Sequence, residues 1–374
     1  MSVITNMFSF SRILQAGKSD FILIGIDRNI AQNNCFCYTI FIMNRDRKAA
    51  IKKLKTLVYS TRQDLDVFRK NIDRTFYSAV IPNNVECIEH KYSNISCDVL
   101  MPEVYSTEKI MIYVHGGSFV GGSRSAYRSF CASIANATSC RVVVPEFRLA
   151  PAYTFPNGIE DLQAVFRSVF TEEQIARSLD SSNPKKPEQP EILIAADGSG
   201  ASLAMALILN LRERYRECIS RVILFSPWLN LTSDSPLIKE RKAHDEIMNG
   251  DCLRRSADVY TYETNLSNPL VSAVMASKES LKGFPPVYIQ LGEKEILLQD
   301  AKTFQRNLHE AGCVCDLDVW PDMMFMFQMA DEYIEESHLA IEKIGRLITY
   351  HEEKVDEQTL SRAPVLEKSL ESEA

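Results

Sequence analysis

A short strand-to-helix turn near the middle of the chain places the strongest limit on the fold. The segment reads Glu191-Ile-Leu-Ile-Ala-Ala-Asp-Gly-Ser-Gly-Ala-Ser-Leu-Ala204. Its apolar run predicts a strand, and the glycines that follow predict a sharp turn. A nucleophile elbow has this form: it carries the pattern G-x-S-x-G and lifts a serine hydroxyl out of a sheet. Here the serine stands one place later than that pattern requires.

This turn has two possible registers, with the nucleophile position at Gly198 or at Ser199. The positions two before and two to three after a nucleophile are crowded by backbone, so they should be small. The Ser199 register puts Asp197 where a glycine is wanted. We favour the Gly198 register, because glycine tolerates the positive φ of a strained turn and the crowded positions then hold only small residues, namely Ala196, Gly200 and Ala201. A plain serine–glycine turn is the simpler alternative.

A second glycine-bearing loop follows an apolar run at residues 109–114. It reads His115-Gly-Gly-Ser-Phe119, which matches the HGG pattern whose backbone N–H groups form the oxyanion hole of lipases and esterases. The candidate residues for such a hole or binding site are therefore His115, Gly116, Gly117 and Ser199.

Three further segments complete a recognisable order. They are Pro-Glu-Phe-Arg-Leu-Ala-Pro at 145–151, Ser-Pro-Trp-Leu-Asn-Leu-Thr at 226–232 and Asn-Pro-Leu-Val-Ser at 268–272. With the loop and the elbow, they resemble the hormone-sensitive-lipase branch of the α/β-hydrolases, also called the GDXG lipolytic family. The resemblance runs over residues 85–328, about two-thirds of the chain. It implies an α/β-hydrolase fold, with a central and mostly parallel sheet, flanking helices and a helical cap.

Of the family's three catalytic residues, this sequence retains only the acid. In the elbow motif, the serine position falls on Gly198. The acid position, which follows a late strand, falls on Glu295. The histidine position, within the run that begins at Trp320-Pro, falls on Phe325. Glycine has no oxygen nucleophile and phenylalanine cannot accept a proton, so the two groups that make and break bonds are absent.

This substitution pattern predicts a protein related to carboxylesterases and lipases that has lost catalysis. Loss of the nucleophile or the base costs such a triad roughly a millionfold in turnover. The oxyanion loop and a capped pocket would still hold a small apolar acyl or carboxylate ligand, or a partner protein. The alternative is an active carboxylesterase that uses Ser199 as nucleophile and Glu295 as acid. A third possibility is a structural protein whose pocket Phe325 fills. We expect no cofactor and no metal.

A replacement base would have to come from another histidine. His115 belongs to the oxyanion loop, and the family uses it structurally. His309 falls in a helix-like stretch before the last strand, and His338 is expected on the final helix. We therefore expect none of these three histidines to act as the base.

Composition excludes some partners and compartments. The net charge is −7 and the sequence contains no stripe of basic residues, so we expect no nucleic-acid partner. The ten cysteines are scattered without metal spacing, which predicts reduced thiols and a cytoplasmic location. No apolar run approaches the ~20 residues needed for a transmembrane segment.

The resemblance to the family covers only part of the chain and predicts how the chain is divided into segments. Residues before Met43 share nothing with the family, so the start of the protein is expected at either Met1 or Met43. From residue 46 to 77, apolar residues recur near helical spacing. The predicted parts are an extension at 1–42, cap helices at 43–84, a hydrolase domain at 85–351 that includes a cap segment at 233–268, and a disordered charged tail at 352–374.

Overall fold

The computed structural model describes residues 46–60, 62–78, 81, 84–104, 109–179, 189–232 and 245–349. Contacts divide the chain into one unit at residues 1–46 and a second at 47–374, and all features below belong to the second unit. The extension expected at 1–42 and the tail expected at 352–374 lie outside the described residues.

The described residues form one eight-stranded sheet in the order β1-β2-β4-β3-β5-β6-β7-β8. Strands β3 to β8 run parallel, while β1 and β2 form an antiparallel hairpin that joins β4 antiparallel. The fold class expected from the motifs is thereby confirmed. The strands are β1 (Val85–Tyr92), β2 (Ile95–Pro102), β3 (Ile110–Val114), β4 (Arg141–Pro145), β5 (Ile192–Asp197), β6 (Ile219–Phe225), β7 (Val287–Gly292) and β8 (Cys315–Trp320).

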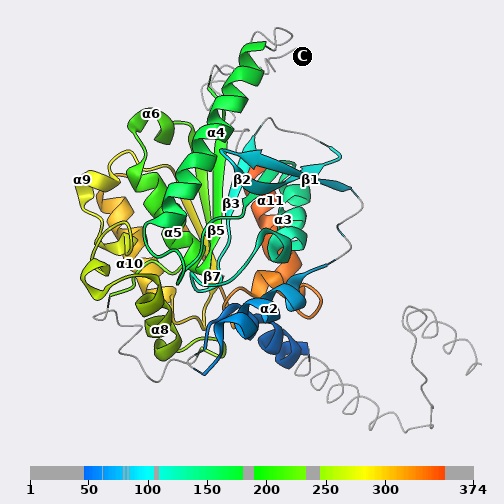
Figure 1. Ribbon diagram of the computed structural model, residues 1–374, viewed down its shortest axis with the longest axis vertical. Helices are drawn as coiled ribbons and strands as arrows, with labels where there is room; N and C mark the ends of the chain where they lie inside the picture. Colours follow the sequence, from blue (N-terminus) through cyan, green and yellow to red (C-terminus); the bar gives the residue numbers. More distant parts are fainter. Residues whose placement is uncertain are drawn as a thin grey trace, which may run out of the picture. The chain divides into compact units, whose positions relative to one another are not determined.

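Helices cover both faces of the sheet, as Figure 1 shows with α5 on one side and α3 and α11 on the other. His309 lies on α10 and His338 on α11, as the sequence predicted. The main helices are α2 (Leu65–Phe76), α3 (Arg124–Thr138), α4 (Asn157–Leu179), α5 (Gly198–Asn210), α8 (Gly250–Tyr260), α10 (Leu298–Glu310) and α11 (Glu335–Thr349). Short helical turns are η1 (Lys55–Leu57), α6 (Glu213–Arg216), η2 (Glu263–Asn265), η3 (Ala273–Met275), α9 (Lys278–Leu281) and η4 (Phe327–Met329).

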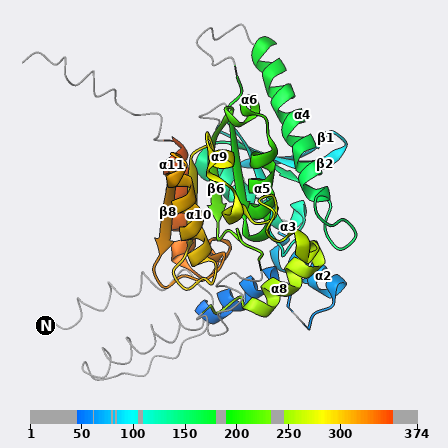
Figure 2. The ribbon, with the colours of Figure 1, turned by 90° about the vertical axis from the view of Figure 1, so that its left-hand side faces the viewer.

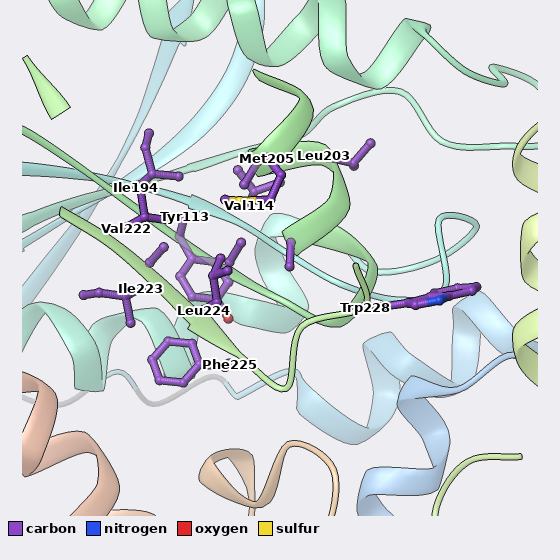
Figure 3. Close-up of a cluster of buried hydrophobic side chains, with 14 of the residues drawn as sticks. Tyr113, Val114, Ile194, Leu203, Met205, Val222, Ile223, Leu224, Phe225 and Trp228 are labelled. Carbon is purple, nitrogen blue, oxygen red and sulfur yellow. The ribbon is translucent and has the colours of Figure 1, made fainter. Parts of the chain in front are cut away.

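The centre of the sheet is apolar on both faces because helices cover both. Every residue of β3 and β5 is buried, which is the pattern of parallel strands in α/β proteins. Helix α5 is also buried along most of its length and packs on β5. Figure 3 shows Tyr113, Val222 and Phe225 within this core. A rigid core therefore supports the ends of β3, β5 and β6.

Two segments lie over one end of the sheet. Residues 47–57 are helical, and α2 follows after a turn in which Asp64 caps the helix by accepting from two backbone N–H groups. Helix α8 contacts the same region, since Arg255 donates to the hydroxyl of Tyr59 at 2.6 Å and to the carbonyl of Gln63 at 3.1 Å. Figure 2 shows α2 and α8 at the same end. The assignment of 43–84 and 233–268 to a cap stays a prediction, and 233–244 lie outside the described residues.

Among the described helices, none combines the length and the apolar character needed to cross a membrane.

Candidate functional site

The strand-to-helix turn begins the site. Strand β5 ends at Asp197 and α5 begins at Gly198, whose φ of +47° lies in the left-handed region that favours glycine. The carbonyl of Gly198 accepts from the backbone N–H of Trp228 at 2.9 Å, which ties the turn to the loop after β6. A Cβ on Gly200 would overlap the carbonyl oxygens of Val114 and His115. This is the crowding on which the Gly198 register was argued.

A buried carboxylate organises the turn and the neighbouring loop. Asp197 accepts from the Gly116 N–H at 2.8 Å, the Tyr113 hydroxyl at 2.9 Å and the Tyr127 hydroxyl at 3.0 Å. Burial raises the pKa of Asp197 to about 7, against the opposing effect of these donors. Since β3, the loop and α3 each supply one donor, this single side chain holds three segments together.

The expected oxyanion loop has a backbone with positive φ values, and one of its N–H groups is hydrogen-bonded to a side chain of the protein. Gly117, Ser118 and Phe119 have φ values of +108°, +59° and +64°. The N–H of Phe119 donates to the hydroxyl oxygen of Ser199 at 3.0 Å, and both residues are buried. The Ser118 hydroxyl accepts from the N–H of Tyr59 at 3.1 Å. One backbone donor of the loop is therefore satisfied by a side chain of α5, and the loop is joined to the segment above it.

His115 is a structural residue of this loop. Its ring stacks on Phe147 at 4.4 Å and on Tyr127 at 5.2 Å between centroids. Its Nδ1 lies 2.8 Å from the carbonyl of Gly116, and a carbonyl only accepts, so Nδ1 carries the proton. Burial lowers the pKa of His115 to about 4, which keeps the ring neutral at physiological pH. The buried neutral imidazole is held by packing and by its own loop.

Glu295, which the sequence predicts at the acid position, has one carboxyl oxygen without a hydrogen-bond partner among the described residues. Oε1 of Glu295 accepts from the Ser226 hydroxyl at 2.8 Å and from the Gly292 N–H. Oε2 is buried and has no partner among the described residues. Burial raises the pKa of Glu295 well above its ordinary value. The Ser226 hydroxyl in turn accepts from the N–H of Met326 at 3.0 Å, next to Phe325. A carboxyl group with one unpartnered oxygen thus lies beside the loop that carries Phe325.

Phe325 lies directly against the turn. A Cβ on Gly198 would be 3.3 Å from Cζ of Phe325, and the ring is 4% exposed. The remaining cavity above Gly198 has a volume of about 20 Å³, which is enough for about one water molecule. Its wall includes residues from the segments over the sheet, among them Leu57, Val58, Met248, Cys252 and Leu253. In this structure the site is closed by apolar side chains.

The comparisons with known proteins agree with this architecture. A family model described as alpha/beta hydrolase fold matches residues 111–329, which is more than half of the chain. The chain therefore belongs to the α/β-hydrolase fold family, and it is related to esterases and lipases of the hormone-sensitive-lipase type. The family recognised from the motifs is confirmed.

Individual proteins that are similar to this chain are named as esterases or hydrolases. An esterase of Acinetobacter venetianus is 29% identical over 245 residues, which cover 65% of this chain and 76% of the relative. An acetyl-hydrolase of Streptomyces hygroscopicus is 28% identical over 240 residues, covering 64% and 75%. Among solved structures, an esterase from the bacterial hormone-sensitive lipase family aligns with a TM-score of 0.70 and 25% identity, over 81% of this chain and 97% of that chain.

The structure brings together most of the residues singled out in the sequence. Gly198, Ser199, Gly117 and Phe325 share the small cavity, while Glu295 lies beneath the loop that carries Phe325. Sequence reasoning missed two contributors. Ser226 begins a family motif and was not predicted to contact Glu295. Its place directly after β6, which pairs with β7, is a signal that could have indicated this contact. Phe119 was not recognised as the donor to Ser199.

Proposed function

We propose that this chain is a non-catalytic member of the hormone-sensitive-lipase branch of its family. The observation that carries the proposal is the contact between Gly198 and Phe325. In the family's arrangement these are the nucleophile and base positions, and here neither side chain can attack an ester or accept a proton. Relatives are named as an esterase and an acetyl-hydrolase, which supports ester hydrolysis as the activity that we propose this chain has lost.

The unused oxygen of Glu295 supports this proposal independently. In a working triad the acid orients the histidine by accepting its N–H. Here Glu295 keeps the position at the end of β7, but Oε2 has no partner among the described residues. A carboxyl group that is retained without its hydrogen-bond donor is what the replacement of histidine by phenylalanine would leave.

The size of the cavity narrows what the site above Gly198 can hold. A volume of about 20 Å³ does not admit an acyl chain or a carboxylate ligand. An acyl or carboxylate ligand at this site stays a prediction, and it requires the segment around η1 and α8 to open. A scaffold that binds its ligand or partner elsewhere agrees better with the closed cavity.

The rival hypothesis is an esterase that uses Ser199. The Ser199 hydroxyl accepts from the loop at Phe119, and no histidine lies among the described residues that line the cavity. An activated serine needs a base within hydrogen-bond reach, so we favour the non-catalytic function.

Fluorophosphonate labelling of the pure protein, read by mass spectrometry, tests the proposal. Such probes react with activated serines, and a catalytically competent relative serves as the positive control. We expect no modified residue under conditions in which the relative is fully labelled. Stoichiometric labelling at Ser199 would overturn the proposal and establish an enzyme with a rebuilt triad.

We also propose a cytoplasmic location. No disulfide joins the described cysteines to one another, and burial raises the pKa of both Cys97 and Cys315 to about 12. Buried, protonated thiols agree with a reducing compartment. Fractionation of cells that express the native protein tests this, and recovery in the secreted or organelle fraction would contradict it.

A further inference from the structure

A second and much larger cavity lies between α3, α11 and the end of α2. Its volume is about 470 Å³, which falls in the range of small-molecule binding sites. It shares none of its described lining residues with the cavity above Gly198. Apolar side chains form part of its wall, including Phe76, Phe130 and Ile341. The fold therefore contains a ligand-sized space apart from the position of the lost catalytic site.

The wall of this cavity includes a buried amide whose hydrogen bonding is incomplete. Gln328 lines the cavity and is 2% exposed. Its Nε2 donates to Oε1 of Gln290 at 3.1 Å, whereas its own Oε1 has no partner among the described residues. A buried carbonyl oxygen without a partner is costly, and a ligand can supply the missing donor.

The orientation of this amide is set by groups on the far side of Gln290. Nε2 of Gln290 lies 3.3 Å from the carbonyl of Ala340 and 3.2 Å from Oδ2 of Asp318. A carbonyl and an ionised carboxylate only accept, so the nitrogen of Gln290 must face them and its oxygen must face Gln328. Gln328 must then donate through its nitrogen. The atom that it leaves free is an acceptor, so the ligand must bring a hydrogen-bond donor.

The ionisation of Asp318 strengthens this argument. Burial alone would raise the pKa of Asp318, but hydrogen bonds from Lys343, Tyr288 and Trp320 hold it below its ordinary value. The carboxylate is therefore charged at neutral pH and cannot donate a hydrogen bond. The amide groups of Gln290 and Gln328 consequently cannot be flipped to the opposite orientation.

The charges around the cavity favour a cation. Three acidic residues line it, Asp331, Glu332 and Glu342, and all are exposed at its rim. Lys53 also lines it, and its ammonium group is 3.0 Å from Glu332, so these two charges offset each other and Asp331 and Glu342 remain as the excess. The excess of carboxylates attracts a positively charged ligand and disfavours an anion.

From these observations we infer that this cavity, defined by Gln328, Phe130, Ile341, Asp331, Glu332 and Glu342, binds a small organic ammonium compound. The apolar part of the ligand packs against Phe130 and Ile341. Its N–H group donates to Oε1 of Gln328, and its charge is balanced by the acidic rim. The inference does not depend on the loss of ester hydrolysis.

Ligand-observed NMR on the full chain tests the inference with three probes of equal length: hexylammonium, hexanol and hexanoate. We expect saturable binding of hexylammonium, weaker binding of hexanol and none of hexanoate. Gln328→Met removes the acceptor at similar size and should weaken hexylammonium binding by about tenfold or more. Gln305→Met is the matched control, because Gln305 donates to the carbonyl of Cys315 and does not line the cavity.

A second variant guards against loss of folding in the first. Glu342 is exposed on α11, so Glu342→Lys should fold normally. It should weaken hexylammonium binding and leave hexanol binding unchanged. Failure of hexylammonium to bind, equally tight binding of hexanoate, or hexylammonium binding that neither variant alters would each overturn the inference.

Discussion

Cζ of Phe325 lies 3.3 Å from the point at which Gly198 would carry a Cβ atom. This separation is tighter than ordinary van der Waals contact, so the two positions constrain each other. A side chain at Gly198 would require the phenyl ring to shift by a few tenths of an ångström, and a smaller ring at Phe325 would relieve this contact. The two departures from the family's triad are therefore coupled by space as well as by chemistry.

Restoring both positions should restore some catalysis. Gly198→Ser with Phe325→His supplies the nucleophile and the base, and the unused Oε2 of Glu295 can accept the imidazole N–H. We expect the double variant to hydrolyse a short-chain nitrophenyl ester measurably above the wild-type protein. Each single variant should stay at the wild-type level, because a nucleophile without a base has little activity.

The same pair predicts a coupling in stability. Gly198→Ser should cost less free energy of unfolding in the Phe325→His background than alone, by about 0.5–3 kcal/mol. Urea denaturation of the four proteins gives this difference directly. A folded double variant with no activity and no coupling would contradict the Gly198 register.

Phe325 should contribute strongly to stability as the filler of the site. Phe325→Ala removes a ring that is 4% exposed, and such changes cost about 3–5 kcal/mol in apolar cores. Chemical denaturation measures the loss. Phe325→Leu keeps most of the volume and should cost clearly less. A negligible effect of Phe325→Ala would mean that the ring does not pack as the structure shows.

Stability should fall as the pH rises because of Asp197. Its pKa is raised to about 7 in the folded protein, whereas an unfolded aspartate titrates near 4. Between these values the unfolded state releases a proton that the folded state keeps. The contribution of Asp197 to the free energy of unfolding therefore decreases from pH about 4 to about 7, by an amount on the order of 4 kcal/mol, and then levels off.

Variants that cannot titrate separate this contribution from the rest of the protein. Asp197→Asn should flatten the dependence of the free energy of unfolding on pH between about 4 and about 7. Glu295→Gln should act in the same direction, since burial also raises the pKa of Glu295. Denaturation curves that are equally steep in pH for wild type and Asp197→Asn would contradict the raised pKa.

Removal of the Ser199 hydroxyl should destabilise the loop that carries Phe119. It should leave the fluorophosphonate experiment unchanged, because we expect no labelling of the wild-type protein either. Ser199→Ala leaves the buried N–H of Phe119 without its acceptor, which should cost about 1–3 kcal/mol. Hydrogen exchange should accelerate at the Phe119 amide in particular. Ser129→Ala, on the half-buried face of α3, is the control and should leave that amide unchanged. Unaltered exchange in Ser199→Ala would show that the bond does not hold the loop.

The fold could be predicted from the order of the family's motifs together with local apolar runs. The runs before His115 and Gly198 are wholly apolar because β3 and β5 are covered on both faces, and this continuity is visible in the sequence. Gly200 was identified as a crowded position, and the carbonyls of Val114 and His115 are the cause. These features depend on residues close in sequence or on motifs of fixed spacing.

Contacts between distant segments could not be predicted in this way. The hydrogen bond from Ser226 to Glu295 spans 69 residues, and that from Phe119 to Ser199 spans 80. The volume above Gly198 depends on how closely η1, α8 and Phe325 approach one another, which no local pattern encodes. The cavity beside Gln328 likewise arises from the packing of α2, α3 and α11.

The three donors to Asp197 have a consequence for how such a protein can change. They come from β3, the glycine loop and α3, so the shape of the turn at Gly198 is maintained by hydrogen bonds within the fold itself. If activity has been lost, as we propose, selection for folding alone is enough to preserve that shape. The chain keeps a prearranged frame, and the Gly198→Ser and Phe325→His variant relies on that frame.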